Sequence, residues 1–258
     1  MIVHYLNKNN SIYFRKRYLA IKWSILGKII TMGMSSFLVN FCSCIIVIIL
    51  NKSLIKYGGV LAVGAYGIVN SIVGLIVMLV FGFNLGMQPI AGYNYGASQN
   101  HRLKEVFLLT MKWTIIVGTI GAILALSIPQ FILRAFTSDE ILVNIGVPAM
   151  RYLNVMMPLI AFTITNSQFF QSIDKPWIAI VTSLSRQVLF LIPLMFLIPL
   201  VVIKLGGEGL TGVWITCTIC DVLGALLAAI LMISQIKVFR QGYIPTARKQ
   251  YKEAGPKK

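Results

Sequence analysis

Long stretches without any charged residue constrain the fold of this chain more than any other feature. The clearest of them are residues 29–51, 57–100, 113–133, 152–173 and 187–203. A bilayer hydrocarbon core of about 30 Å is crossed by about 20 apolar residues in an α-helix. A helix satisfies its backbone hydrogen bonds internally, and these stretches lack the polar–apolar alternation of a membrane β-barrel. The sequence therefore predicts an all-α integral membrane protein.

Six membrane-spanning helices are predicted. Their approximate ranges are 26–50, 60–90, 106–130, 144–171, 176–203 and 209–237. The second range is too long for one straight crossing, and its glycines and Pro89 predict a kink or a cytoplasmic extension near Pro89. We predict three parts of the chain: a polar segment at 1–24, the six-helix bundle at 25–238 and a basic, disordered tail at 239–258. Within the first part, residues 12–23 are predicted to form an amphipathic helix on the inner membrane surface.

The basic residues predict how the helices are oriented. The chain has 23 Lys and Arg and a net charge of +16, concentrated at its two ends and in the second loop, around Arg102 and Lys104. Cytoplasmic loops are rich in Lys and Arg, so both termini are predicted to be cytoplasmic. The first loop is a mild exception to this rule, because it is predicted to lie outside the cell and yet contains Lys52 and Lys56. This distribution argues against nucleic-acid binding and favours contact with anionic membrane lipid.

The four cysteines include the spacing Cys217-x-x-Cys220, which resembles a redox or metal motif. Both residues fall inside the last predicted span, and the two histidines, His4 and His101, fall in polar segments. We interpret these cysteines as packing residues and predict no metal site.

The most informative motif is residues 82–97, GFNLGMQPIAGYNYGA. Its two G-x-x-x-G pairs let helices approach closely, and Pro89 bends a helix. Three amides stand where a lipid-facing helix would carry Leu: Asn84, Gln88 and Asn94. Their cost is tolerable if they face a water-filled cavity or a packed partner.

This motif is similar to the eighth transmembrane helix of multidrug and toxic compound extrusion (MATE) transporters. Four further stretches resemble other parts of that family, in the same order along the chain. Residues 56–68 resemble the turn between helices seven and eight, and residues 169–176 resemble the turn after helix ten. Residues 185–193 resemble helix eleven, and residues 209–221 resemble helix twelve. The resemblance covers about residues 20–240. It points to the C-terminal half of such a transporter, closest to the MepA-like bacterial branch.

The resemblance implies an antiporter of the bacterial plasma membrane, not an enzyme. Members export cationic, amphipathic drug-like molecules by alternating access, driven by H⁺ or Na⁺ and without a bound cofactor. They have two six-helix lobes, of which this chain would be the second, with residues 1–24 as part of the connection between lobes. The missing N-terminal lobe is then the expected partner, and the chain alone is expected to be inactive or partial.

Two charged residues stand out as candidates. Asp221 is the only acid well inside a predicted span, so it either binds the coupling ion or a cationic drug, or pairs with an amide, hydroxyl or Arg to fix helix packing. Arg186 is predicted to mark the cytoplasmic end of the fifth span, although it could be a cavity charge. Spans one and four lack the acidic residue that some family members carry there.

Cavity-lining or interhelical roles are predicted for seven uncharged residues: Met34, Asn40, Asn84, Gln88, Asn154, Asn166 and Gln168. Asn40 and Gln88 are preferred because their spans match the helices that line the C-terminal cavity in the family. For all seven, packing between helices is the competing interpretation.

Other functions remain as alternatives. A flippase for lipid-linked saccharides would need an Arg-rich groove, and these spans contain little Arg. A membrane enzyme would need a polar cluster near the membrane face, which seven acids and two histidines do not form. Counting the antiporter as the first possibility, the flippase and the membrane enzyme are the second and third, and a nonfunctional fragment is the fourth.

Overall fold

The structure is a computed structural model that describes residues 23–240. Nearly all of the predicted amphipathic helix and of the basic tail therefore lies outside the described residues. The chain divides into two units, residues 1–38 and 39–258. Of the first unit, the structure describes one helical segment, residues 23–38. All regular elements between residues 23 and 240 are helices, which confirms the all-α class.

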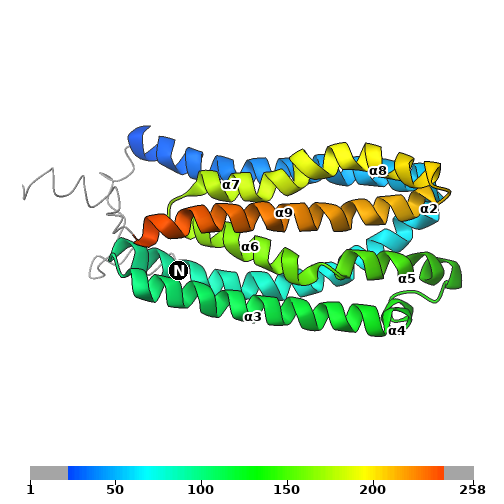
Figure 1. The fold of residues 1–258 in the computed structure, drawn as a ribbon, viewed down its shortest axis with the longest axis horizontal. Coiled ribbons are helices and arrows are strands. Elements are labelled where there is room, and N and C mark those ends of the chain that lie inside the picture. Colours follow the sequence, from blue (N-terminus) through cyan, green and yellow to red (C-terminus); the bar gives the residue numbers. More distant parts are fainter. Residues whose placement is uncertain (1–22, 241–258) are drawn as a thin grey trace, which may run out of the picture. The chain divides into compact units, whose positions relative to one another are not determined.

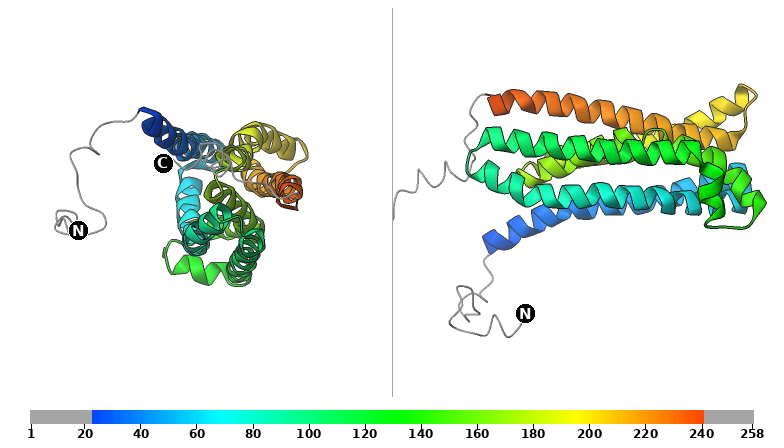
Figure 2. Two further views of the ribbon diagram at one scale, coloured as in Figure 1. Left: turned by 90° about the vertical axis from the view of Figure 1, so that its left-hand side faces the viewer. Right: turned by 90° about the horizontal axis from the view of Figure 1, so that it is seen from below.

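The longest helix, α2 (Trp23–Gly96), is two helices joined at a sharp turn. Its 74 residues would measure about 110 Å as a continuous helix, far more than a bilayer core. Gly59, with φ 72° and ψ −173°, is the one residue inside α2 with non-helical angles. In the second unit, residues 39–58 form a first arm and residues 60–96 a second arm, which runs back in the opposite direction (Figures 1 and 2).

The break in α2 corrects one sequence prediction. The sequence predicted a kink or a cytoplasmic extension near Pro89. The kink is wrong, because the backbone remains helical through Pro89 and on to Gly96, whereas an extension of the helix is present and its cytoplasmic side stays a prediction. The second arm is thus a long helix that extends beyond the predicted end of the span at residue 90. A proline in a helix removes one hydrogen bond, whereas Gly59 adopts a conformation that reverses the chain.

The remaining helices follow in short succession: α3 (Asn100–Ser127), α4 (Pro129–Arg134), α5 (Glu140–Asn154), α6 (Met157–Ser172), α7 (Pro176–Leu184), the π-helix Ser185–Leu191, α8 (Ile192–Lys204) and α9 (Gly209–Arg240). Helices α5 and α6 replace the single predicted span 144–171, and they are bent by 50° at their junction. Pro158, at the start of α6, accounts for this bend because it lacks a backbone N–H and disfavours helical geometry in the residue before it.

The helices provide six segments that are long and apolar enough to cross a membrane. Residues 37–96 are apolar enough to span and break at Gly59, which gives two crossings. Helix α3, the bent pair α5–α6, the continuous helix 177–204 and α9 give four more. By length and composition, six segments of the described residues are therefore able to cross a membrane, which agrees with the predicted number but with shifted boundaries.

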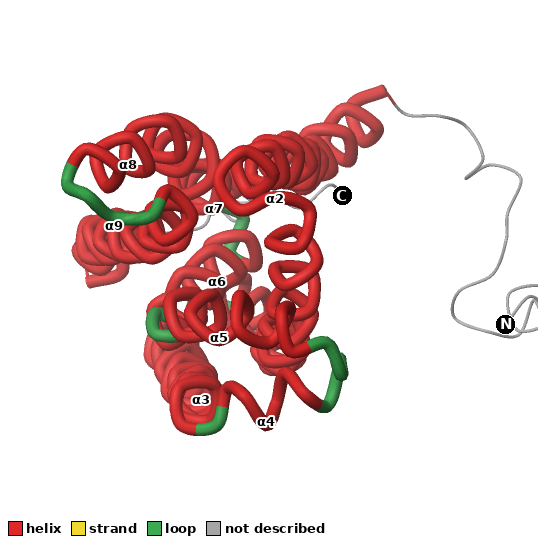
Figure 3. Tube along the Cα trace, turned by 90° about the vertical axis from the view of Figure 1, so that its right-hand side faces the viewer, coloured by secondary structure: helices red, strands yellow, loops and turns green. Residues whose placement is uncertain are grey.

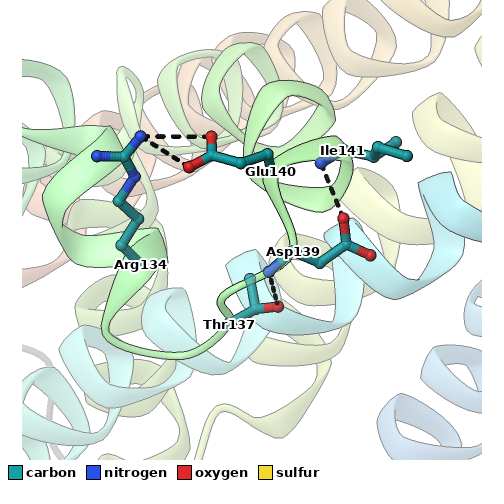
Figure 4. A network of polar contacts seen from close by, with 5 residues as sticks. All are labelled: Arg134, Thr137, Asp139, Glu140 and Ile141. Carbon is teal, nitrogen blue, oxygen red and sulfur yellow. Dashed lines mark hydrogen bonds and ion pairs between the residues drawn. The ribbon is translucent and has the colours of Figure 1, made fainter.

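The turns of the second unit alternate between the two ends of the bundle. The turns α2–α3 and α6–α7 lie at one end, and Gly59, α4 and the α8–α9 loop lie at the other (Figures 1 and 2). Figure 3 looks onto the latter end. There Asp139 caps α5 by accepting a 2.9 Å hydrogen bond from the Ile141 N–H, and Arg134 pairs with Glu140 at 2.9 Å (Figure 4).

The largest core cluster is built around α9. Trp214, fully buried, stacks on Tyr66 with the ring centroids 6.1 Å apart. Leu54 from the first arm and Met150 from α5 are buried in the same cluster. Helix α9 packs against α8, α6 and α5, while α3 packs mainly against α6.

At Gly212, the backbones of α8 and α9 approach each other closely. A Cβ atom at Gly212 would lie 2.7 Å from the backbone Cα of Pro199. We expect Gly212→Ala to destabilise the purified protein by about 1–3 kcal/mol, because two backbones rather than a flexible side chain would have to separate. Gly74→Ala is the matched control, since a Cβ there meets nothing within 4 Å. Thermal unfolding in detergent measures the difference, and equal melting temperatures would contradict the close approach.

Candidate functional site

Several polar side chains of the spans lie buried inside the bundle, while much of its outer surface is apolar. Asn84, Asn154 and Asn166 are fully buried. Leu75 and Met78, by contrast, are among the many large apolar side chains on the outside. Polar groups are costly in hydrocarbon and therefore gather at helix interfaces or functional sites. The interior of the bundle is thus the place to look for a site.

An ion pair joins α9 to the π-helix well inside the two helices that it connects. The Arg186 Nη1 donates to the Asp221 Oδ1 at 2.7 Å, with side-chain exposures of 30% and 9%. Asp221 lies about 18 Å along α9 from Gly209, and Arg186 lies about 14 Å along its helix from Trp177. Such a charge-assisted hydrogen bond is stronger than a neutral one, and it compensates a carboxylate that is almost completely buried.

The local structure positions Arg186 for this contact. It lies in the π-helix, Ser185–Leu191, a widened turn of a kind that is frequent at functional sites. Gly224, one helical turn after Asp221, faces the stem of Arg186: a Cβ there would lie 3.0 Å from the Arg186 Cβ. On the other side, Ser43 of the first arm donates to the Gln187 Oε1 at 3.0 Å.

The sequence predicted that Arg186 marks the end of a span. The structure instead places Arg186 inside a helix. The helix continues on both sides of it, from Trp177 to Lys204. A lone Arg would extend its side chain toward the membrane surface, but the carboxylate of Asp221 gives it a partner inside the bundle. Sequence reasoning missed Gly224 and Ser43, although Gly224 shares a helix face with Asp221 by its i,i+3 spacing.

A second polar group, the amide cluster, joins the second arm of α2 to α3 and α6. The Asn84 Nδ2 donates to the Thr165 Oγ1 at 3.4 Å, and this hydroxyl donates to the Thr114 Oγ1 at 3.0 Å. One turn further along α2, the Gln88 Nε2 donates to the Gln168 Oε1 at 2.9 Å. Three of the predicted amides thus connect helices directly, which is the geometry of the packing interpretation.

Three buried amide oxygens in the described bundle accept no hydrogen bond: the Oδ1 atoms of Asn84, Asn154 and Asn166. Each amide nitrogen donates to the carbonyl four residues earlier in its own helix. Asn94 makes the same local bond, to the Ile90 carbonyl. An unpaired acceptor in an apolar interior is unfavourable, so these oxygens are available to a water molecule, a cation or a donor on a substrate.

Two other predicted residues lie elsewhere. Met34 is in the first unit, where it is exposed. Asn40 is exposed on the first arm of α2, whereas the amide cluster is formed by the second arm, α3 and α6.

Thr165 connects the amide cluster, and its removal gives a testable result. We expect Thr165→Val to lower stability by about 0.6 kcal/mol, the average for interhelical hydrogen bonds in a membrane protein, and by no more than about 1.7 kcal/mol, their maximum. Thr163→Val on the same helix is the control, since the Thr163 hydroxyl donates only to the Leu159 carbonyl of its own helix. Chemical unfolding in detergent compares the two variants, and a larger loss for the control would contradict the proposed connection.

Comparison with known proteins identifies the family to which this helical chain is similar. Residues 32–197 match the model of the MatE family. The multidrug export protein MepA of Staphylococcus saprophyticus is 20% identical over 231 residues, which cover 90% of this chain and 49% of that protein.

Solved structures give the same result. A MATE protein crystallised in complex with MaL6 superposes with a TM-score of 0.81 at 19% identity, over 92% of this chain and 53% of that one. The MATE multidrug transporter DinF-BH has a TM-score of 0.76 at 33% identity, over 92% of this chain and 52% of that one. The chain therefore spans about half the length of the relatives it matches.

The family model covers well over half of the chain, and the helical fold superposes on about half of each solved MATE protein. This chain belongs to the MatE family, and its fold is that of one six-helix lobe of a MATE-type transporter.

Proposed function

We propose that this chain is the C-terminal lobe of a cation-coupled multidrug antiporter in a bacterial plasma membrane. It would export cationic, amphipathic compounds in exchange for H⁺ or Na⁺ and would depend on a partner N-terminal lobe. The observation that carries the proposal is the match of about nine-tenths of the chain to only about half of MATE proteins. Secondary transporters place their sites near the midplane between two repeats, so one lobe offers only half of such a site.

The interior of the lobe supplies chemistry suited to this role. The unpaired amide oxygens of Asn84 and Asn166 can accept hydrogen bonds from a substrate or coordinate a cation. The carboxylate of Asp221 can exchange its bond to Arg186 for a proton or a metal cation. A coupling ion changes the orientation of a transporter only if its affinity differs between the two orientations, and a pair that opens and closes provides such a difference.

A saccharide-lipid flippase is less well supported. It would need several arginines in its groove to hold a pyrophosphate group. In the described spans, Arg186 already has the carboxylate of Asp221 as its partner.

A chimera tests the proposal. Residues 25–240 would replace the C-terminal half of the Staphylococcus saprophyticus MepA protein, expressed in a host that lacks its own efflux pumps. We expect the chimera to export two cationic dyes, ethidium and a rhodamine, and an agent that dissipates the H⁺ or Na⁺ gradient to stop this export. The 258-residue chain expressed alone is expected not to export either dye.

Two outcomes would contradict the proposal. A chimera that reaches the membrane in normal amount but exports neither dye would remove the transport assignment. Export by the chain alone, in a form that is monomeric in detergent, would show that no partner lobe is needed.

A further inference from the structure

A cavity of about 360 Å³ lies between the first arm of α2 and α8, away from the ion pair and the amide cluster. Its walls are a polar helix face from α2 and two apolar residues from α8: Ile49, Lys52, Ser53, Lys56 and Tyr57, with Met195 and Phe196. The α2 residues are spaced by one, three and four positions, so they form a single stripe along the helix. The volume is within the range of about 300–1,000 Å³ typical of small-molecule sites.

The cavity is positively charged. Of the described residues that line it, Lys52 and Lys56 are charged and none is acidic, and no ion pair involves either lysine within the described chain. The hydroxyl groups of Ser53 and Tyr57 add two hydrogen-bond donors. Two cations and two hydroxyls around one hollow are suited to a phosphate group.

Tyr57 gives this cavity a fixed wall. A Cβ at Gly209 would lie 2.6 Å from the Tyr57 Cδ1, so the ring packs directly against the start of α9. The ammonium of Lys56 lies 5.1 Å from the centroid of the same ring, within the range of a cation–π contact. Lys56 is therefore oriented by a ring that is itself held by α9.

The position of the cavity indicates where its ligand comes from. Lys52 is seven residues before the turn at Gly59, so it lies about 10 Å, or two helical turns, inside that end of the bundle. On α8, Phe196, Leu197 and Leu200 are all more than half exposed, which makes this side of the cavity a lipid-facing surface. Both lysines are exposed on this surface, so their ammonium groups can meet an anionic group that approaches from the membrane.

We propose that this cavity binds the phosphate head group of an anionic membrane phospholipid. Lys52 and Lys56 hold the phosphate, Ser53 and Tyr57 donate hydrogen bonds to the head group, and Met195 and Phe196 contact the first carbons of an acyl chain. Such a lipid also explains why two lysines that the sequence assigned to the first loop lie on the last turns of the first arm of α2.

Native mass spectrometry of the purified 258-residue chain, stripped of lipid in detergent, tests this site. The probes are phosphatidylglycerol and a diacylglycerol with the same acyl chains but no phosphate. We expect phosphatidylglycerol to remain bound under conditions that remove the diacylglycerol. The double variant Lys52→Gln/Lys56→Gln is expected to bind phosphatidylglycerol about thirty-fold more weakly, since each lysine near an anionic lipid contributes a factor of about five.

The matched control is Lys104→Gln/Lys112→Gln, which removes two exposed lysines from α3, outside the cavity. It is expected to bind phosphatidylglycerol as the wild type does, and all variants are expected to melt at the same temperature without lipid. The site would be overturned if both double variants bound phosphatidylglycerol more weakly by the same factor. It would also be overturned if the protein retained the diacylglycerol as well as it retains phosphatidylglycerol. Displacement of phosphatidylglycerol by millimolar inorganic phosphate would show that a soluble phosphate compound, not a lipid, is the ligand.

Discussion

Arg186→Leu is expected to destabilise the lobe by about 3–5 kcal/mol, because it leaves the carboxylate of Asp221 buried without its partner. Asp221→Asn is expected to cost less, since the remaining guanidinium is 30% exposed and can reach water. In the MepA chimera, both variants are expected to reduce ethidium export to background. Thermal unfolding and an efflux assay at matched expression measure the two effects separately.

The double variant Arg186→Gln/Asp221→Asn separates packing from ion coupling. Two neutral side chains that bond to each other restore most of the stability, so its melting temperature is expected to return toward that of the wild type. Export is expected to stay at background, because no acid is left to exchange a cation. A double variant that exports ethidium like the wild type would show that the pair serves packing alone.

The control for this series is Glu140→Gln. Glu140 also pairs with an arginine, Arg134, at 2.9 Å, but both side chains are more than half exposed at one end of the bundle (Figure 4). Exposed ion pairs contribute about 0–1 kcal/mol. We therefore expect little change in stability or export, in contrast to the buried pair.

Gly59→Val is expected to produce the second large effect, by preventing the reversal of α2. The angles of Gly59, φ 72° and ψ −173°, lie in a region that only glycine occupies freely, at a cost of about 1–3 kcal/mol for other residues. A β-branched residue is restricted further. A Cβ at Gly59 meets nothing within 4 Å, so this loss comes from the backbone and not from a steric clash.

Purification yield and melting temperature measure this second effect. Gly67→Ala is the control, since it lies in the second arm of α2 with helical geometry and open space for a Cβ. A Gly59→Val protein as stable as the Gly67→Ala control would contradict the sharp turn between the first two crossings.

The number of crossings could be predicted from the sequence because lipid imposes a simple requirement on length and charge. Charge-free stretches locate the helices, whereas the orientation inferred from the basic loops stays a prediction. The bend between α5 and α6 was harder to predict, because residues 152–173 form one uninterrupted apolar run and a proline inside a membrane helix does not always bend it. The turn at Gly59 depends on a backbone conformation that composition alone does not specify.

The partners inside the bundle could not be predicted. Arg186 and Asp221 are separated by 35 positions, and Gln88 and Gln168 by 80. Such pairs depend on how helices pack, whereas helix periodicity reports only on neighbours three or four positions apart. Sequence reasoning could identify Asp221 as a costly buried acid and could name an Arg among its possible partners. It could not say which Arg, and it preferred to place Arg186 at the cytoplasmic end of the fifth span rather than in a cavity.

We claim that this chain crosses the membrane six times, with successive turns on opposite sides, as one lobe of a MATE-type transporter. Single cysteines at exposed turns test it most directly, in a variant whose four native cysteines, all unpaired in the structure, are replaced by alanine. We expect a membrane-impermeant maleimide to label Ser138→Cys and Glu208→Cys in intact cells, and Gln99→Cys and Asp174→Cys only after permeabilisation. Labelling of Gln99→Cys and Ser138→Cys from the same side of the membrane would contradict the claim.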